Sequence, residues 1–279
     1  MTERIGFLQG RLSVPVGGRI QAFPWTHWRE EFPLAEANGL SVMEWTLDQE
    51  RLYNNPLLTA DGQAEIRRLC AQHAMTIPSL TGDCFMQAPF WKACGEPRAA
   101  LLRDFEAIAD ACVAVGIHTI VVPLVDNGRL DNPAQEDLLV AEFSARVPFL
   151  AARGLRVVFE SDFAPAELAR FIARFEPARF GINYDMGNSA AMGWDAAEEL
   201  ATYGGRVTNV HVKDRIRGGT TVPLGTGACD FERVFTALAA AGFSGTYILQ
   251  TARATDDDHA GVLARYHDMT QAWIAANGA

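Results

Sequence analysis

Four polar side chains stand where apolar runs end in the second half of the chain: Glu160, Asp185, His211 and Gln250. Each closes a stretch rich in Val, Ile, Phe or Tyr, a composition typical of a buried strand. Carboxylate, imidazole and amide donors suit Mn²⁺, Co²⁺, Mg²⁺ or Zn²⁺. One such residue alone is typical of a cap or a loop anchor, but four at the ends of successive strands favour a shared divalent-metal site.

The elements that must position these residues repeat as a short strand followed by a helix. We expect strands near 4–9, 41–47, 76–81, 118–124, 155–160, 180–185, 206–212 and 246–251. Helical spacing of apolar residues is plainest over 98–115, 135–152 and 231–241. Eight such units without a linker predict an α/β fold, a single-domain (β/α)8 TIM barrel over residues 1–279. An open doubly wound sheet is the alternative, but no G-x-G-x-x-G follows the first strand.

The composition limits the classes of partner. Lys and Arg number 24 against 34 Asp and Glu, a net charge of −10, which disfavours a nucleic-acid partner. No run of about twenty apolar residues predicts a membrane span, and the first residues lack the layout of a secretory signal. The five cysteines are scattered without a C-x-x-C, as expected for reduced thiols. We expect a cytoplasmic homo-oligomer that binds neither membrane nor nucleic acid.

Two segments that follow strands are rich in Pro, Gly and aromatic residues: 13–26 and 82–97. Both are expected at the carboxyl-end face of the barrel, where barrel enzymes build their active sites. Their aromatic residues are predicted to form either an apolar wall of the site or packing within the loops and between subunits; they are Phe23, Trp25, Phe85, Phe90 and Trp91.

Several runs along nearly the whole chain resemble one protein family. They are LQGRLS (8–13), VMEWTLD (42–48), VVFES (157–161), NYDMGNSAAMG (183–193), NVHVKDR (209–215), PLGTGACDF (223–231) and ILQTAR (248–253). The chain resembles the xylose-isomerase-like TIM barrel superfamily, of the sugar phosphate isomerase/epimerase type, which also includes ketose 3-epimerases and, more distantly, endonuclease IV. The resemblance implies metal ligands at Glu160, Asp185, His211 and the position of Gln250, and a substrate contact at Arg217.

The chain departs from the family pattern at Gln250. Ketose epimerases normally carry a second glutamate there, which is both a metal ligand and the base paired with the glutamate of the fifth strand. An amide oxygen can still bind a cation, but it cannot take a proton near neutral pH. Proton transfer must then use Glu160 alone, a metal-bound water, or another acid or base such as Glu44, Asp83 or Asp126.

Glu44 is the second predicted catalytic carboxylate, after Glu160. It alternates with Val42 and Thr46 along a strand, so its side chain is expected inside the barrel near the mouth. A carboxylate confined in a site can acquire a shifted pKa suited to proton transfer. The structural alternative is an ion pair or hydrogen bond with a barrel neighbour such as Arg11.

Basic residues after the seventh strand suggest how an anionic substrate is held. Lys213, Arg215 and Arg217 precede a loop with Gly225 and Gly227, whose backbone amides could meet a phosphate. Arg11 and Asn188 are two further predicted substrate contacts. The alternative is a solvated charge run with local pairing.

The nuclease branch of the family is not favoured. It needs added histidines after the third and fourth strands, a D-x-x-H on the sixth and a D-x-H after the seventh, whereas residues 185–188 read Asp-Met-Gly-Asn. We therefore predict a metal-dependent sugar or sugar-phosphate isomerase or epimerase, with Mn²⁺ as the expected ion, which abstracts a proton next to a metal-bound carbonyl. A lyase or dehydratase acting on a keto-sugar or inosose, and a non-catalytic sugar-binding barrel, are the alternatives.

Overall fold

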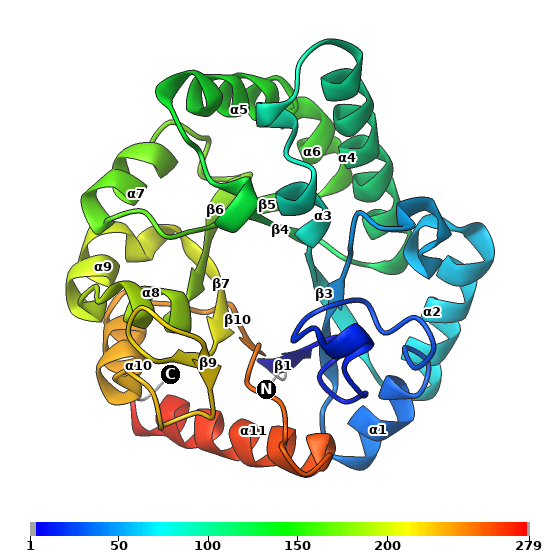
Figure 1. The fold of residues 1–279 in the computed structure, drawn as a ribbon, viewed down its shortest axis with the longest axis vertical. Helices are drawn as coiled ribbons and strands as arrows, with labels where there is room; N and C mark the ends of the chain where they lie inside the picture. The colour runs from blue at the N-terminus through cyan, green and yellow to red at the C-terminus, as the bar shows by residue number, and fades with distance from the viewer. Residues whose placement is uncertain (1–3, 278–279) are drawn as a thin grey trace.

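The computed structural model describes residues 4–277, and it contains a closed barrel of eight parallel strands (Figure 1). The strands follow one another around the barrel in chain order, and the last pairs with the first. They are β1 (Ile5–Leu8), β2 (Val42–Thr46), β3 (Thr76–Thr81), β4 (Thr119–Leu124), β5 (Arg156–Ser161), β6 (Phe180–Asp185), β7 (Val207–Val212) and β10 (Thr246–Leu249). The predicted (β/α)8 fold is confirmed, with each strand within two residues of its expected bounds.

Helices form the outer ring of the molecule (Figure 1). They are α1 (Glu31–Ala37), α2 (Ala60–Gln72), α3 (Asp83–Gln87), α4 (Gly95–Val115), α5 (Pro133–Ala145), α6 (Val147–Arg153), α7 (Pro165–Ile172), α8 (Met186–Met192), α9 (Ala196–Tyr203), α10 (Phe231–Ala240) and α11 (His259–Ala276). Within residues 4–277, none of these helices has the length and apolarity needed to cross a bilayer.

The helix predicted over 135–152 is two helices. The chain leaves α5 at Arg146, whose backbone angles are φ −93° and ψ 3°, and starts α6 at Val147. Pro148 explains the break, because it has no N–H to donate to the carbonyl four residues earlier and its ring crowds the preceding turn. Gly154 ends α6 with φ 67°, a left-handed conformation that suits glycine.

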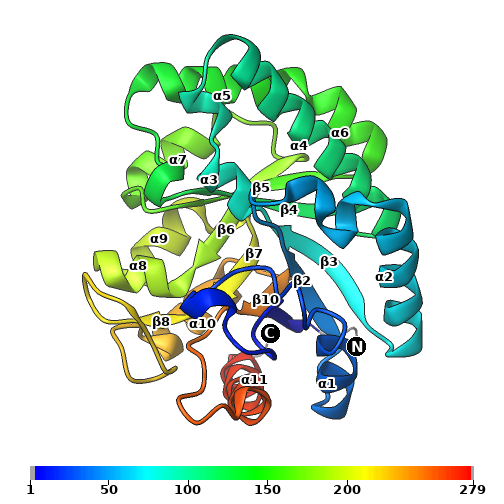
Figure 2. The same cartoon turned by 45° about the vertical axis from the view of Figure 1, so that its right-hand side comes forward.

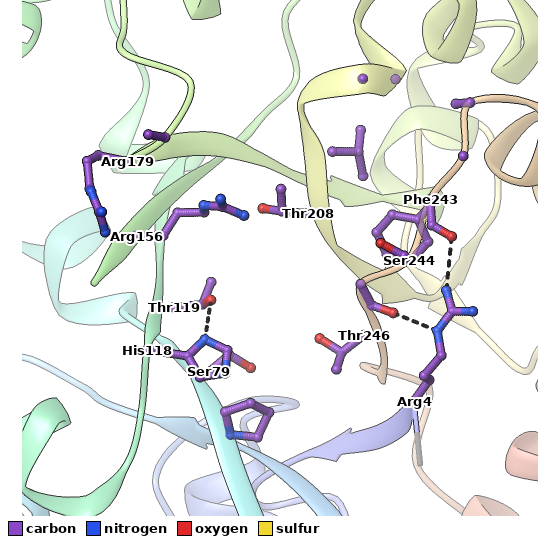
Figure 3. Close-up of a pocket in the computed structure, with 18 of the residues that line it drawn as sticks. Arg4, Ser79, His118, Thr119, Arg156, Arg179, Thr208, Phe243, Ser244 and Thr246 are labelled. Atoms are coloured by element: carbon purple, nitrogen blue, oxygen red, sulfur yellow. Dashed lines mark hydrogen bonds between the residues drawn. The ribbon is translucent and has the colours of Figure 1, made fainter. Parts of the chain in front are cut away.

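The barrel has two distinct ends. The carboxyl ends of the strands form a mouth, and a short antiparallel hairpin, β8 (Asp214–Arg215) with β9 (Thr221–Val222), stands at its rim beside α8 (Figure 2). The amino ends of the strands form the opposite end of the barrel, called the floor here. The floor contains a cavity (Figure 3). Loops at the carboxyl end are where barrel enzymes place their chemistry, whereas the floor is usually structural.

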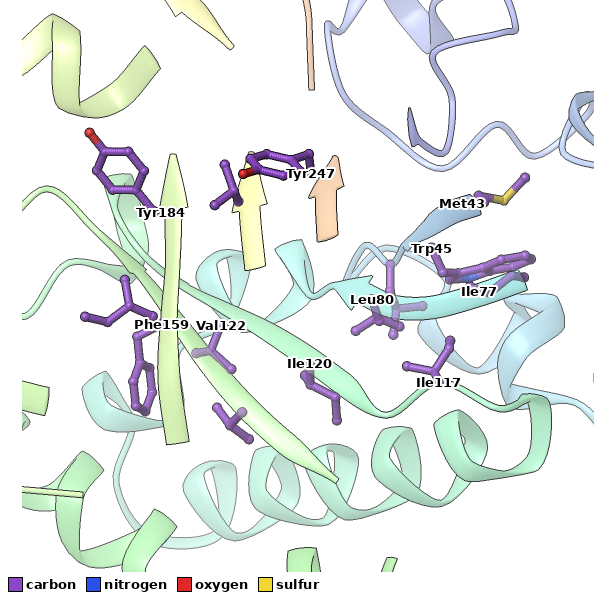
Figure 4. Close-up of a cluster of buried hydrophobic side chains, with 14 of the residues drawn as sticks. Met43, Trp45, Ile77, Leu80, Ile117, Ile120, Val122, Phe159, Tyr184 and Tyr247 are labelled. Carbon is purple, nitrogen blue, oxygen red and sulfur yellow. The ribbon is translucent and has the colours of Figure 1, made fainter. Parts of the chain in front are cut away.

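The apolar core lies mainly between the strands and the helices around them. Figure 4 shows one part of it, where Ile120 and Val122 of β4 face α4 and Phe159 lies alongside on β5. Phe143 of α5 packs edge-on against Phe159, with ring centroids 5.7 Å apart. Because this packing fixes the strands against their helices, the barrel holds its strand ends in place for the polar residues at the mouth.

Candidate metal and sugar site

Three of the four predicted ligands converge at the mouth of the barrel. Glu160 at the end of β5, Asp185 at the end of β6 and His211 on β7 each offer one donor atom, and these donors lie within 4.8 Å of one another. The sheet register accounts for this, since Asp185 lies directly opposite His211 and β6 lies between β5 and β7. All three side chains are buried, so their charges are little screened by water.

Asparagine side chains hold Glu160 in place. Asn188 of α8 donates to one carboxylate oxygen over 2.8 Å, and Asn183 of β6 donates to the other over 3.0 Å. Asp185 is fixed differently: its Oδ1 accepts the backbone N–H of Asn188 over 2.8 Å and so caps the start of α8. The second oxygen of Asp185, Oδ2, accepts a hydrogen bond from Lys213 Nζ over 3.1 Å.

The His211 ring lies between two carboxylates. Its Nε2 is 2.7 Å from Glu44 Oε1, and its Nδ1 is 3.2 Å from Glu160 Oε2. Burial alone would lower the pKa of His211, but the two carboxylates outweigh burial and raise it to about 10. When Nε2 carries a proton and donates to Glu44, Nδ1 is left as the nitrogen on the ligand side, the arrangement typical of a metal-bound histidine.

Glu44 points into the barrel, as predicted, but it lies below the mouth. Its side chain is fully buried and accepts hydrogen bonds from Ser79 and Asn209, at 2.6 and 2.9 Å, and from Thr81. Burial acts to raise the pKa of Glu44, but His211 and these hydroxyls lower it overall. The partner of Glu44 is therefore His211 and not Arg11. Glu44 does not line the cavity at the mouth of the barrel.

Gln250 belongs to a polar chain across the mouth. Its Oε1 accepts a hydrogen bond from Lys213 Nζ, which also donates to Asp185 Oδ2, both over 3.1 Å. Its Nε2 donates to Gln21 Oε1 over 2.8 Å, and Gln21 in turn donates to Asp83 over 2.7 Å. Gln21 was not predicted as a site residue, although it lies in the segment 13–26 expected at this face.

Asp83 is the carboxylate at the far end of this chain. Burial, with smaller contributions from Asp48 and Glu160, raises the pKa of Asp83 to about 7. It starts α3, two residues after the end of β3, and lines the mouth cavity, as does Lys213 at the other end of the polar chain. A carboxyl group with this pKa can either give or take a proton near neutral pH.

The mouth opens into a cavity of about 830 Å³. Polar and charged side chains dominate its wall: Gln21, Asp83, Gln87, Asp126, Arg129, Glu160, Asp162, Asn188, Lys213, Arg215 and Gln250. The predicted aromatic wall is absent from the described lining. Phe23, Phe85, Phe90 and Trp91 are buried in the core, so these aromatic residues pack within the loops instead.

The cations predicted to bind substrate separate into two groups. Lys213 lines the cavity, as does Arg215, whose Nη1 donates to Asn188 Oδ1 over 2.7 Å. Arg217 lies outside it, with its guanidinium against Gly193 and a hydrogen bond of 3.3 Å to the Gly193 carbonyl. Arg11 is buried beneath the wall and donates to the Ile20 carbonyl over 2.6 Å, so it supports the loop that carries Gln21.

The loop amides predicted to meet a phosphate already have a partner. Gly225 and Gly227 donate to Asp214 Oδ2 over 2.9 and 2.8 Å, and Cys229 donates to Asp214 Oδ1 over 3.1 Å. Asp214 is fully buried and folds the loop around itself. Neither glycine lines the mouth cavity, so an anion there would meet the side chains rather than these amides.

The barrel and its Glu-Asp-His cluster define the class of protein. The chain belongs to the family described as xylose isomerase-like TIM barrel, whose pattern matches residues 32–268. Among known proteins, it is 36% identical to L-ribulose-5-phosphate 3-epimerase UlaE of Escherichia coli O1:K1 / APEC, over 95% of this chain and 96% of the relative. The family expected from the sequence motifs is thus confirmed.

Solved structures of low sequence identity share the fold. An L-ribulose 3-epimerase aligns with a TM-score of 0.74 at 12% identity, over 98% of this chain and 95% of the other. The IOLI protein with a bound zinc atom aligns with a TM-score of 0.73 at 15% identity, over 99% of both chains.

Proposed function

We propose that this protein is a divalent-metal-dependent 3-epimerase of a ketose phosphate. The observation that carries the proposal is the convergence of Glu160, Asp185 and His211 within 4.8 Å at the carboxyl-end mouth. The relationship to an L-ribulose-5-phosphate 3-epimerase at 36% identity supports the choice of reaction. Cytoplasmic location and a homo-oligomeric state are part of the proposal.

The residues present fit a divalent cation. Two carboxylates and an imidazole are donors that Mn²⁺ accepts, and the Gln250 oxygen adds a neutral fourth donor. A cationic group already occupies the outer part of this cluster, since the Lys213 ammonium bridges Asp185 and Gln250. When bound, the ion supplies Lewis-acid polarisation of the ketose carbonyl, which lowers the pKa of the adjacent C–H.

We assign proton transfer on the two faces of the sugar to two carboxyl groups. Glu160 is the base that we assign to one face of the ketose, held by Asn183 and Asn188. Asp83 is the group that we assign to the other face, because Gln250 cannot carry a proton and Asp83 has a pKa of about 7. Glu44 acts indirectly in this scheme, by orienting His211.

We assign phosphate recognition to Arg215. Its Nη1 donates to Asn188, and its Nε and Nη2 donate to the Gly219 carbonyl over 3.0 and 2.6 Å. A guanidinium has five N–H groups. One N–H on each terminal nitrogen is therefore left for an anion, a pair that matches two phosphate oxygens.

The test is the fate of the C3 proton of L-ribulose 5-phosphate in D₂O. We expect loss of the C3–H signal and appearance of the C3 epimer, both dependent on added Mn²⁺, with the ion removed by chelation before the spectrum is recorded. Full turnover after exhaustive chelation would contradict the metal requirement. Glu160→Gln should abolish exchange, whereas Glu167→Gln, at an exposed position of α7, is the matched control.

A lyase or dehydratase is the second candidate, and Gln250 is the observation that favours it. Elimination also begins with proton removal beside a carbonyl, but it needs no second base to return the proton to the opposite face. The same spectra separate the two reactions, because elimination produces a deoxy-keto product. If no ketose or keto-sugar shows exchange or elimination with Mn²⁺, Co²⁺, Mg²⁺ or Zn²⁺, the chain is a non-catalytic binding barrel.

A further inference from the structure

The floor of the barrel contains a positively charged cavity that lies outside the proposed epimerase site. It has a volume of about 720 Å³ and opens between the amino ends of the strands (Figure 3). Its charged or titratable lining residues, among residues 4–277, are Arg4, His118, Arg156 and Arg179. No described lining residue is a carboxylate, although the chain as a whole carries a net charge of −10.

Arg156, the first residue of β5, is the central cation of this cavity. Its side chain makes no hydrogen bond or ion pair with any residue in 4–277. Figure 3 shows its guanidinium directed across the cavity towards Thr208. The side-chain hydroxyl of Thr208 is itself buried without a hydrogen-bond partner among the described residues. Two polar groups that face one another across this space therefore lack protein partners.

The charge of Arg156 shifts the pKa values of two nearby basic side chains, His118 and Arg206. Burial, and then the charge of Arg156, lower the pKa of His118. The same two effects, in the same order, lower the pKa of Arg206, whose Nε is buried without a partner in the described part of the chain. A group of cations that repel one another without a carboxylate among them is unfavourable unless an anion joins them.

The lining also supplies neutral donors. His118 Nδ1 lies 3.1 Å from the hydroxyl of Thr119, and Ser244 and Thr246 stand on the opposite wall. Arg179 makes only a long hydrogen bond, 3.3 Å, to the Leu155 carbonyl, so most of its donors remain available. Guanidinium and hydroxyl donors around a small cavity are the chemistry that recognises a phosphate group.

We propose that this floor cavity binds a phosphate-type dianion, held chiefly by Arg156, with Arg179 at the rim as a second cation. The ligand is either inorganic phosphate or the phosphate group of a small phosphomonoester. The site is independent of the proposed epimerase reaction, because it lies at the opposite end of the barrel and shares no lining residue with the mouth cavity.

The experiment measures thermal unfolding at constant ionic strength, with chloride replaced by phosphate. The Arg215→Gln background removes the anion contact at the mouth, so that any remaining response reports the floor. In this background we expect about 10 mM phosphate to raise the Tm by roughly 2 °C or more. Adding Arg156→Gln to this background should leave the Tm measured without phosphate unchanged or higher, because repulsion between the cations of the floor is relieved. It should remove at least half of the rise in Tm that phosphate causes.

A matched control removes the same charge elsewhere: Arg68→Gln, at an exposed position of α2, should keep the full response. Arg179→Gln is a second variant for the case in which Arg156→Gln fails to fold. Comparison of inorganic phosphate with glycerol phosphate shows whether the site prefers the free ion or a phosphomonoester, since the tighter ligand shifts the Tm more at equal concentration. An unchanged phosphate response in both floor variants, or no response in the Arg215→Gln background, overturns the proposal.

Discussion

The ammonium group of Lys213 donates a hydrogen bond of 3.1 Å to the side-chain oxygen of Gln250, at the position where the family pattern has a glutamate. The same ammonium lies 3.1 Å from Asp185 Oδ2. Gly187 makes this approach possible, because a Cβ at that position would lie 2.7 Å from the Lys213 side chain. A protein cation therefore shares two donors with the proposed metal, in a cluster whose fourth donor is a neutral amide.

The first prediction concerns this competition. Lys213→Met should tighten Mn²⁺ binding about tenfold, since loss of a neighbouring positive charge is worth on the order of 1.4 kcal/mol. Isothermal titration of the metal-free protein measures the effect. Lys92→Met is the natural control, because Lys92 is the chain's only other lysine and pairs with Asp131 away from the cluster. Equal tightening in both variants would mean that the effect is one of net charge alone.

The second prediction concerns Asp83. Asp83→Asn should reduce epimerisation by about 100-fold or more, because an amide cannot return a proton to the sugar. Proton removal by Glu160 should continue, so that the starting ketose still exchanges its C3 proton for deuterium. The measurement is the ratio of exchange to inversion in D₂O. Parallel loss of both would place Asp83 in binding or stability rather than proton transfer.

Asp83 also predicts the pH dependence of the wild-type enzyme. Its pKa is raised to about 7 by burial. In the direction in which Asp83 donates a proton, it must be protonated, so kcat/KM should fall as the pH rises above about 7. In the reverse direction it must be ionised, so kcat/KM should fall as the pH drops below about 7. These opposite slopes should disappear in Asp83→Asn.

The third prediction compares two arginines that lie two residues apart. Arg215→Gln should raise the KM for a ketose phosphate by about tenfold to a hundredfold, because Arg215 lines the cavity and charge-assisted bonds to phosphate are strong. Arg217→Gln should change KM less than about threefold, because Arg217 packs on Gly193 outside the cavity. The reverse result would restore the family-based assignment of the substrate contact to Arg217.

The same two arginines show where sequence reasoning stops. The eight strands could be predicted because each buried strand is a short apolar run. The cluster of Glu160, Asp185 and His211 could be predicted because these residues stand at the ends of such runs. Which arginine faces the sugar depends instead on the β8–β9 hairpin, in which Arg215 pairs with Thr221. The pairing register of so short a hairpin leaves no hydrophobic pattern in the sequence, so the side that each arginine faces could not be read.

A polar layer inside the barrel was also missed, although the sequence contains a signal for it. Asn183 and Asn209 lie two residues before Asp185 and His211, and the period of two in a strand directs them to the same side. The structure places both inward, where Asn183 bonds Glu160 and Asn209 bonds Glu44. By contrast, Gln21 comes from an irregular loop, where side-chain direction follows no period.

The fourth prediction tests Glu44 as a positioning residue. In wild type the Glu44 carboxylate accepts hydrogen bonds from His211, Ser79 and Asn209. Glu44→Gln keeps one accepting oxygen and replaces the other with an NH₂ group, which faces donors and cannot accept their hydrogen bonds. We expect a loss of about 2–4 kcal/mol in the free energy of unfolding and roughly tenfold to hundredfold weaker Mn²⁺ binding. Ser79→Ala removes one hydroxyl bond to the same carboxylate, should cost about 1 kcal/mol, and should leave metal affinity unchanged.

The fifth prediction concerns Glu31, which anchors the loop after β1. Its carboxylate accepts hydrogen bonds from Gly10 N at 2.8 Å and from Leu12 N and Ser13 Oγ at 3.0 Å. Burial raises the pKa of Glu31 to about 7, despite these bonds, which act to lower it. In the unfolded chain a glutamate titrates near about 4.3.

Between these two pKa values Glu31 holds a proton in the folded protein that it has lost in the unfolded chain, so the contribution of Glu31 to stability should fall as the pH rises from about 4.5 to 7. Glu31 contributes up to roughly 2–3 kcal/mol to that fall. Urea unfolding at several pH values should show a smaller slope for Glu31→Gln than for the wild type, and an unchanged slope for Glu167→Gln. An equal pH dependence of stability in Glu31→Gln and the wild type would show that the carboxylate of Glu31 is ionised in the fold.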